Sequence, residues 1–492
     1  MTMIQSAAQY HQRSSYDRHN MSGHYLDWQN QPSVFKEYPE IEPIPLPRDV
    51  PLPSESFSAL FEKRGKHADA KTLGLETLST ILLLTNTLTA RARHADGDFF
   101  FRSAASAGAL YPNEVYVATE AVQGLEDGLY HFSIQYHGLS PLRKGQFSGS
   151  QDKAARLTFF FTAIFFRSAW KYRDRSYRYH LLDAGHLIEN MVLGLKALGL
   201  PFVLSYDFDD TLANHLLGLD QTREVALAML HIPEEATPVP EGIPGLPEEF
   251  HRASTVCKNE TDYPAVREMH QAGATPHLPG EPLPGMIREL GPAPDSWAPI
   301  PPPVGAPDTM GYPEALFRRR SKRNFISKPI SRDSLHTLLH TQCAVDPEGI
   351  QRAPYHGSLC VGFIVGNAEE MEPGLYLLDT MNRAAGLVTS GSFTEKMARI
   401  CLDQMWLANA GIHFLYMANL HLLEQAWGPR GYRYAMLSAG RLGQRLYVAA
   451  TSLGLGCCGI GALYDAEAAA LLGLDESSKL LYVIAVGRIK KA

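Results

Sequence analysis

The sequence predicts two domains of the same α+β fold, packed against each other as an intramolecular pseudo-dimer. Three observations support this prediction. A chain of 492 residues can bury two large cores. The chain resembles itself at an offset of about 255 residues, which indicates duplication of a whole domain rather than a short repeat. Within each half, helical and extended segments follow one another without the regular alternation of a doubly wound parallel sheet.

The composition is typical of a globular protein and argues against a nucleic-acid partner. Hydrophobic residues make up 45% and charged residues 20% of the chain, and the mean hydropathy is -0.16, all typical of globular proteins. Lysine and arginine number 45 against 52 acidic residues, a formal charge of -7. This balance lacks the basic surplus that a phosphate backbone requires, so we expect no nucleic-acid partner.

The cysteines and the apolar runs indicate a cytoplasmic protein without a membrane anchor. The six cysteines show no CxxC or Cys/His ligand spacing, so neither a disulfide framework nor a zinc site is expected. The first 21 residues lack the apolar run of a secretory signal. The longest apolar run, 157–166, is about half the length of a membrane helix and is typical of a strand buried on both faces.

Five short motifs recur in the same order in the two halves. They are Gly-Leu-Tyr at 128–130 and 374–376, Tyr-Arg-Tyr at 177–179 and 432–434, Asp-Ala-Gly-His at 183–186 with Ser-Ala-Gly-Arg at 438–441, Ala-Leu-Gly-Leu at 197–200 with Ser-Leu-Gly-Leu at 452–455, and Leu-Leu-Gly-Leu-Asp at 216–220 and 471–475. The order predicts an N-terminal extension (1–50), a first domain (51–232), a linker (233–313) and a second domain (314–492). The linker holds 18 of the 33 prolines, and its length lets the two domains pack face to face at modest entropic cost.

The same elements are expected in both halves. In the first, 73–86 has apolar residues at helical spacing, a strand follows around Val115 and Val117, then the strand 157–166 and a long helix over 183–198. In the second, 331–340, 360–365, 411–417 and 438–453 repeat this order. Gly199 and Gly454 follow the two long helices, where helix C-terminal signals stand.

Two segments could bind a planar, phosphate-bearing ligand. Arg319, Ser321 and Arg323 alternate in a basic run that could hold one phosphate, although a solvated basic face is the ordinary alternative. The small residues of 103–112 allow close backbone approach to a ring, although the segment is equally typical of a tight turn before a strand. The glycine-rich run 454–461 bares backbone N–H groups but fits no phosphate-loop spacing.

A third segment could transfer protons. Lys171 and Tyr172 lie beside Arg173 and Arg175, and most such clusters are surface charge. Burial near Phe165, Phe166 and Trp170, together with the two arginines, should lower the pKa of Lys171. For Tyr172 the arginines lower the pKa and burial raises it.

Two further features are interpreted as structural. His186 and Asp183 could suggest a metal, but their counterparts are Arg441 and Ser438 and no third ligand is evident, so a structural or capping role is favoured. Cys457 and Cys458 are interpreted as small buried residues without a catalytic role.

Taken in order, these segments resemble the FMN-dependent nitroreductase superfamily, and most closely its SagB-type branch of azoline dehydrogenases, which oxidise thiazoline or oxazoline rings in modified peptides. The resemblance includes 11–39, with Leu26-Asp27-Trp28, Asn30-Gln31-Pro32 and Lys36-Glu37-Tyr38-Pro39, and continues through 106–112, Lys171-Tyr172 and 177–186. It covers nearly the whole chain outside the linker.

The resemblance implies specific roles. The residues for the FMN phosphate and ribityl chain are Arg319, Ser321, Arg323 and Arg488, those beneath the isoalloxazine ring are Ala105, Ser106, Ala107 and Gly108, and those near its reactive nitrogen are Gly459, Ile460 and Gly461. Lys171 and Tyr172 would deprotonate the substrate ring carbon while hydride leaves to FMN.

Comparing each element with its own copy predicts a single composite pocket. The phosphate-side elements stand in the second half, and the ring-side and proton-transfer elements in the first. Their counterparts are Lys63, Gly65 and His67, Pro233, Leu204-Ser205-Tyr206, Tyr355-His356-Gly357 and Gly428-Pro429. We therefore expect one FMN per chain.

The leading interpretation is an FMN-dependent oxidoreductase that oxidises a heterocycle in a peptide or related small molecule, with dioxygen reoxidising the flavin. One alternative is an NAD(P)H-dependent reductase of nitro compounds or quinones. Another is a flavin-binding scaffold in a peptide-maturation complex. The expected partners are a peptide or small-molecule substrate and, where the chain acts in a maturation complex, peptide-maturation proteins.

Overall fold

The computed structural model describes residues 3–21, 23, 25–61, 73–94, 97–147, 156–232, 242–275, 283, 285–303, 308–343 and 357–490. Each half contains a seven-stranded antiparallel sheet, and the two sheets have the same strand order. The first is β1 (Ile44–Pro45), β6 (Gly138–Lys144), β5 (Gly128–Ser133), β4 (Asn113–Glu120), β7 (Arg156–Ile164), β9 (Glu224–Ile232) and β8 (Val203–Ser205). The second is β10 (Ala298–Pro299), β13 (Ala384–Ser390), β12 (Gly374–Asp379), β11 (Cys360–Val365), β14 (Ile412–Asn419), β16 (Ser478–Gly487) and β15 (Gly456–Ile460).

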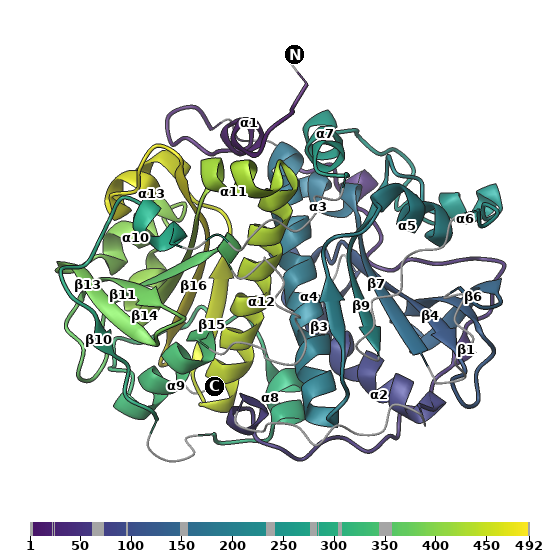
Figure 1. Cartoon of the computed structure of the whole chain (residues 1–492), viewed down its shortest axis with the longest axis horizontal. Coiled ribbons are helices and arrows are strands. Elements are labelled where there is room, and N and C mark those ends of the chain that lie inside the picture. The colour runs from purple at the N-terminus through teal and green to yellow at the C-terminus, as the bar shows by residue number, and fades with distance from the viewer. Residues whose placement is uncertain are drawn as a thin grey trace.

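Helices cover the sheets and fill the space between them (Figure 1). In the first half they are α1 (Ala7–Arg13), α2 (Leu75–Thr85), α3 (Phe165–Tyr172), α4 (Ser176–Leu198) and α5 (Asp210–Leu217). Then follow α6 (Glu248–Arg252), α7 (Pro264–Ala272), α8 (Tyr312–Arg318), α9 (Arg332–Cys343), α10 (Thr394–Ile400), α11 (Leu420–Trp427), α12 (Arg430–Ser452) and α13 (Asp465–Leu472). The tandem α+β fold and the pseudo-dimer are confirmed.

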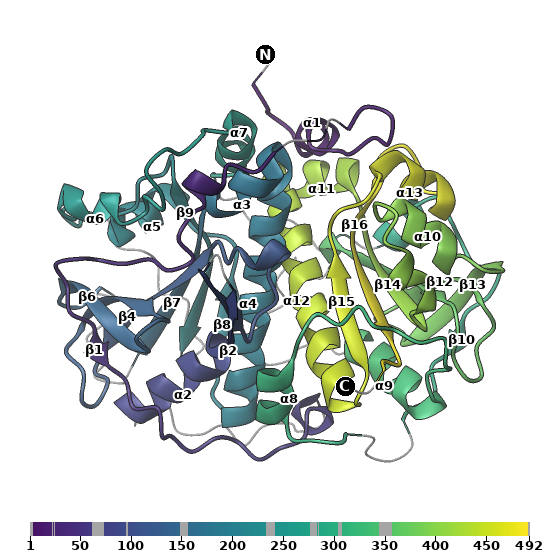
Figure 2. The ribbon, with the colours of Figure 1, turned by 180° about the vertical axis from the view of Figure 1, so that it is seen from behind.

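The two long helices α4 and α12 lie against each other at the centre, with one sheet on either side (Figures 1 and 2). Their closest approach is at Gly185 and Gly440. A Cβ on Gly185 would lie 2.8 Å from the Cα of Gly440 and would overlap the carbonyl oxygen of Leu437. The duplicated Ala-Gly pair thus lets the two backbones touch at the pseudo-twofold axis.

The predicted elements are present, but both long helices begin earlier than expected. α4 begins at Ser176 and α12 at Arg430, rather than at 183 and 438. The first turns contain Arg178 and Arg433, each only 1% exposed. Each pairs with an aspartate of the opposite half.

These arginines belong to two equivalent buried ion clusters across the seam between the halves. Arg178 Nη1 lies 2.6 Å from Asp465 Oδ1, and Arg433 Nη2 lies 2.7 Å from Asp210 Oδ2. A histidine completes each cluster, from α1 in one case and from α7 in the other. They are His11, 3.2 Å from Asp465, and His270, 3.3 Å from Asp210.

The segment 233–313, expected as a linker, differs from that expectation in its described part. It contains α6, α7 and β10, and β10 pairs with β13 as β1 pairs with β6. Helices α1 and α7 lie over the same end of the seam (Figures 1 and 2). The duplication therefore extends to the N-terminal extension, whose copy the prolines obscured.

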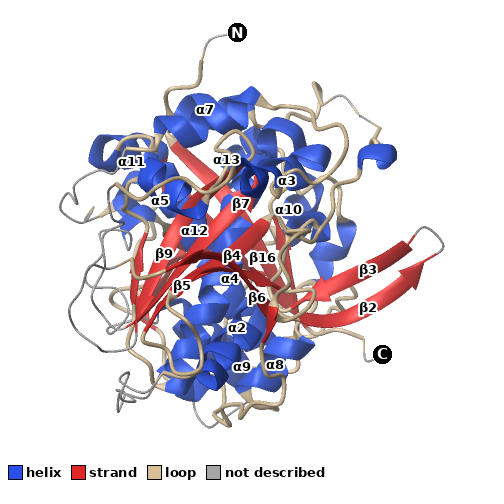
Figure 3. Cartoon of the chain, turned by 90° about the vertical axis from the view of Figure 1, so that its right-hand side faces the viewer, coloured by secondary structure: helices blue, strands red, loops and turns tan. Residues whose placement is uncertain are grey.

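A two-stranded ribbon, β2 (Leu88–His94) and β3 (Gly97–Arg102), projects from the body (Figure 3) and leads directly into the 103–112 segment. Within the described residues, no helix has both the length and the apolar character needed to span a membrane.

Candidate active site

A cavity of about 170 Å³ lies at the seam and is lined by both halves. From the first half it takes Ala105, Ser106, Ala107, Gly108, Tyr172, Tyr179, Leu182, Asp183 and His186. From the second it takes Ser321, Arg323, Gln404, Tyr447, Cys458, Gly459, Ile460, Gly461, Ala462 and Tyr482. The structure thus brings most of the predicted site residues to one composite pocket.

The ring-side loop is held by a carboxylate from α4. Ser106 Oγ donates to Asp183 Oδ2 at 2.6 Å, and the Ala107 N–H donates to both carboxylate oxygens at 3.1 Å. Gly108 follows with a φ of 65°, which favours glycine. A Cβ there would lie 2.8 Å from Tyr172 Oη and 3.3 Å from Lys171 Nζ. The loop is therefore held in one shape, and it has no side chain at Gly108, where Lys171 and Tyr172 approach it.

Asp183 and His186 support the site, in agreement with the structural role favoured from the sequence. Burial raises the pKa of Asp183 to about 7, against the hydrogen bonds from Ser106 and Ala107, which lower it. Burial lowers the pKa of His186 to about 3, so the ring is neutral. Its two nitrogens lie 2.8 Å from Gln444 Oε1 and 3.0 Å from Tyr482 Oη.

The predicted phosphate-side residues divide into two groups. Ser321 and Arg323 line the cavity. Arg319 is buried, and its guanidinium donates to the carbonyls of Ser103 at 2.8 Å and Arg102 at 2.9 Å. It thus anchors the strand that enters the ring-side loop. Arg488 is exposed outside the cavity lining, and its carbonyl accepts the Ile326 N–H.

The glycine loop leaves no room for side chains. A Cβ at Gly459 would overlap the Tyr482 hydroxyl, and one at Gly461 would lie 2.5 Å from the Tyr179 ring. The loop therefore presents backbone to the cavity between two aromatic side chains.

Lys171 and Tyr172 end α3, beside Gly108. Burial lowers the pKa of Lys171, and the charge of Arg323 lowers it further. The expectation that Arg173 and Arg175 would supply this effect is wrong, because the second half supplies the nearby cation. Burial raises the pKa of Tyr172, with Asp183 acting in the same direction and Arg323 opposing. Lys171 is therefore suited to accept a proton, and Tyr172 remains a hydroxyl donor.

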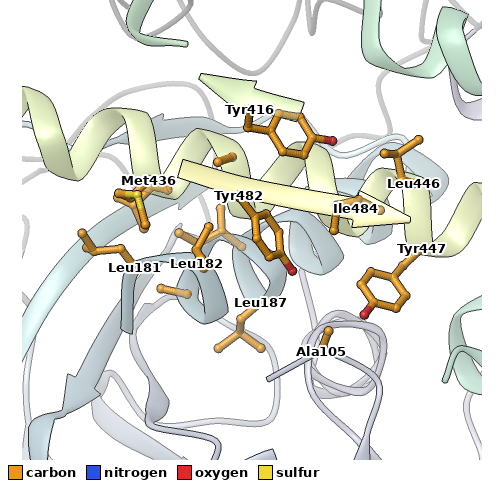
Figure 4. Packing of buried hydrophobic residues seen from close by; sticks show 14 of the residues in the cluster. Ala105, Leu181, Leu182, Leu187, Tyr416, Met436, Leu446, Tyr447, Tyr482 and Ile484 are labelled. Atoms are coloured by element: carbon orange, nitrogen blue, oxygen red, sulfur yellow. The ribbon is translucent and has the colours of Figure 1, made fainter. Parts of the chain in front are cut away.

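Three tyrosines that line the cavity were not among the predicted site residues. Tyr447 Oη lies 2.9 Å from Ser321 Oγ and accepts the Gly459 N–H at 2.6 Å, which ties two predicted elements together. The hydroxyls of Tyr447 and Tyr482 point toward the side on which Ala105 lies (Figure 4). Tyr179 packs against Tyr172 with ring centroids 4.4 Å apart. At the repeat offset Val192 stands where the second half has Tyr447, a difference that could have revealed Tyr447. The strand register places Ala228 opposite Phe161, where the second half has Tyr482 opposite Tyr416.

The pseudo-twofold axis relates this cavity to a counterpart on the other side of the seam, where described side chains occupy the equivalent space. Tyr206 stands in place of Gly461 and is fully buried, stacked on Tyr434. Arg441 stands in place of His186, and both it and Arg445 bind Glu189. Lys63, Gly65, His67, Pro233, Tyr355 and His356, which were compared with the site residues, lie outside the described part of the chain.

One predicted alignment is corrected by the structure. Helices α3 and α11 end at Tyr172 and Trp427, each followed by a residue of positive φ, Arg173 and Gly428. Tyr172 therefore corresponds to Trp427, and not to Pro429.

Comparison with known proteins agrees with this architecture. The nitroreductase family model matches residues 66–232 and 316–488. The chain belongs to the nitroreductase family. A nitroreductase homologue from Methanocaldococcus jannaschii, MJ1384, is 31% identical over 179 residues, which are 36% of this chain and 89% of that one. The trifolitoxin-processing protein TfxB of Rhizobium leguminosarum bv. trifolii is 29% identical over 223 residues, 42% of this chain and 60% of TfxB.

The tandem arrangement of this nitroreductase-family chain also occurs in a solved structure. A crystal structure of a nitroreductase homologue from Anabaena variabilis superposes with a TM-score of 0.77 at 25% identity, covering 99% of this chain and 100% of that one. The chain is thus a nitroreductase-family oxidoreductase related to a trifolitoxin-processing protein.

The residues at the cavity fit a flavin. A planar ring needs close approach to the backbone, which Gly108, Gly459 and Gly461 allow because they line the cavity and carry no side chain. A phosphate needs a cation and hydroxyl donors, and Arg323 and Ser321 are exposed at the cavity. A second cavity, of about 520 Å³, shares Tyr172 with this one.

Proposed function

We propose that this oxidoreductase binds one FMN at the seam and oxidises an azoline ring in a peptide to the aromatic azole. The observation that carries the proposal is the position of Lys171 Nζ and Tyr172 Oη over Gly108, with the pKa of Lys171 lowered. Similarity to a trifolitoxin-processing protein supports a peptide substrate and peptide-maturation partners.

The residues divide the work as follows. Arg323 and Ser321 would hold the phosphate and ribityl chain, and Ser106 to Gly108 would support the ring. When bound, the flavin supplies an acceptor for the two electrons of a hydride. Lys171 takes the proton from the ring carbon, so that the azoline loses one proton and one hydride and gains a double bond. Tyr172, which keeps its proton, donates a hydrogen bond toward the reacting ring.

The test is turnover of a thiazoline-bearing peptide, followed as loss of two mass units with the bound flavin identified after release. Lys171→Ala should keep the flavin and lose turnover by about 10²–10⁴-fold, the usual contribution of a general base. Lys144→Ala, at an exposed ion pair with Glu126, is the matched control and should behave as wild type. Wild-type turnover by the Lys171 variant would remove this mechanism.

The same preparation distinguishes the competing activity. A reductase of nitro compounds or quinones would show rapid bleaching of the flavin by NAD(P)H, whereas an azoline dehydrogenase would be bleached by the thiazoline peptide. Isolation without flavin and without turnover would favour a scaffold role.

A further inference from the structure

The larger cavity, of about 520 Å³, shares Tyr172 with the composite pocket. The end of α3 forms one wall, with Lys171, Tyr172, Arg173 and Asp174. The N-terminal extension forms the other, with residues between Arg13 and Leu26. Lys171 lines this cavity and its amine also lies beside Gly108 of the composite pocket, so a substrate at the amine can extend into the space beneath the extension.

The extension is fixed over this cavity by contacts with both halves. Tyr10 Oη donates to the Asp174 carbonyl at 2.7 Å, and the Tyr16 N–H donates to Asp465 at 3.0 Å. Arg18 binds Glu467 and Asp403, at 2.8 and 2.9 Å. The wall is therefore a built part of the fold.

Arg173 stands out on the opposite wall. Its φ of 50° and ψ of -133° lie in a region that L side chains rarely adopt, and the equivalent residue in the other half is Gly428, with φ 56° and ψ -159°. Such strain destabilises the folded chain, and a glycine would avoid it. An exposed arginine is thus retained next to Lys171 and Tyr172 where the duplicated copy uses glycine.

The charges around Arg173 leave it available to a ligand. Asp174 pairs with Arg13 at 3.0 Å, and Asp465 pairs with Arg175 at 2.7 Å. Asp17, also in the lining, accepts the His19 N–H and the Asn20 side-chain amide at 2.8 and 3.0 Å. Arg173 itself hydrogen-bonds the Tyr263 hydroxyl, whose pKa burial raises, so this neighbour carries no compensating charge.

We propose that this cavity receives the peptide flanking the substrate heterocycle, and that Arg173 binds a carboxylate of that peptide close to the ring. The inference rests on the proposed function and names its substrate class, a peptide with an acidic residue or its C-terminal carboxylate near the azoline. Met21 and Leu26 add apolar surface for the neighbouring residues of the peptide.

The experiment measures binding by fluorescence anisotropy with thiazole peptides that cannot turn over. One probe carries Glu beside the ring and a C-terminal amide, one carries Gln and the amide, and one carries Gln with a free C-terminal carboxylate. We expect the flavin-loaded protein to bind at least one carboxylate probe about ten-fold more tightly than the Gln amide, as for a charge-assisted hydrogen bond. The carboxylate probe that binds more tightly shows whether Arg173 recognises an acidic side chain or the C-terminal carboxylate.

Arg173→Gly should abolish this preference while leaving the protein as stable as wild type or more so, because the strain is released. Arg383→Gly is the matched control, since Arg383 is also exposed, with a φ of 52°, on a turn of the second half, and it should keep the preference. Equal binding of all three probes, absence of binding, or an unchanged preference in Arg173→Gly would overturn the inference. Turnover of a thiazoline peptide without a carboxylate preference would overturn this inference and leave the proposed function standing. A carboxylate preference without turnover would support peptide binding in this cavity and count against the proposed function.

Discussion

Gly185 and Gly440 meet where α4 crosses α12, so closely that a Cβ on either would overlap a carbonyl oxygen of the opposite helix, that of Leu437 or Leu182. A glycine inside an exposed helix costs about 1 kcal/mol relative to alanine. Here the cost is offset by direct backbone contact between the halves. The position of every residue at the composite pocket depends on this contact, because the pocket takes its walls from both halves.

We predict that Gly185→Ala and Gly440→Ala each lower the free energy of unfolding by about 1–3 kcal/mol or more, because the overlapped groups are backbone and cannot turn aside. The measurement is urea denaturation. Gly194→Ala, on the same helix, is the control, since its new methyl would meet side chains and no backbone: Leu84 at 3.2 Å and the Tyr312 hydroxyl at 3.9 Å. Unchanged stability of the Gly185 variant would contradict the tight crossing.

Arg323→Ala should weaken flavin binding about ten- to a hundred-fold, the loss expected for one charge-assisted hydrogen bond. Titration of the apoprotein with FMN measures this, and Arg399→Ala, at an exposed pair with Glu395, is the control. Wild-type flavin absorbance should correspond to one FMN per chain, because Tyr206 and the Glu189 cluster fill the counterpart pocket. Two FMN per chain would refute the single-pocket prediction.

Arg319→Ala is expected to act differently, although the sequence grouped the two arginines. Since Arg319 donates to the Arg102 and Ser103 carbonyls, its loss leaves buried acceptors unsatisfied and should cost about 1–3 kcal/mol of stability. Thermal unfolding of the flavin-free protein shows whether Arg319 stabilises the fold or serves only the ligand. A flavin-free Arg319→Ala protein as stable as wild type would show that Arg319 serves the ligand alone.

The rate of azoline oxidation should rise with pH and level off at a pH below 10.5, since the pKa of Lys171 is lowered from that value and the neutral amine is the base. Tyr172→Phe should leave this ascending limb in place, because the raised pKa of Tyr172 keeps the phenol protonated over the same range. A pH–rate profile of both proteins checks this. Loss of the limb in Tyr172→Phe would assign the titration to the phenol.

Asp183 should make the folded protein less stable as pH rises. Its pKa is about 7 when folded and near 3.8 otherwise, so the folded state binds more protons between these values. The stabilising contribution is complete below about pH 4 and is lost as pH rises through 7. Asp183→Asn, which keeps one acceptor oxygen for Ala107, should remove this pH dependence and gain in stability relative to wild type from pH 4 to 7. Parallel melting curves for the two proteins across this range would contradict the assignment.

Much of the fold and of the site was predictable from local sequence and internal repetition. The apolar run 157–166 predicted a buried strand, because apolar periodicity reflects which face of an element is buried. The repeated Ala-Gly motifs predicted that the α+β domain is duplicated. The differences between each site element and its counterpart predicted that the first half supplies Gly108 and the second half Arg323. A pocket that binds a ligand requires these residue types, whereas a pocket filled by side chains does not.

Only the tertiary structure decided how charged residues are used. Arg319 and Arg323 stand four positions apart in one basic run, yet one binds backbone carbonyls and the other faces the cavity. Arg173 stands two positions after Lys171 in the sequence. The cation that lowers the pKa of Lys171 is nevertheless Arg323 of the other half. Charge acts through space and through burial, so the order of residues determined which groups this protein carries, and the packing of α4 on α12 determined which of them meet.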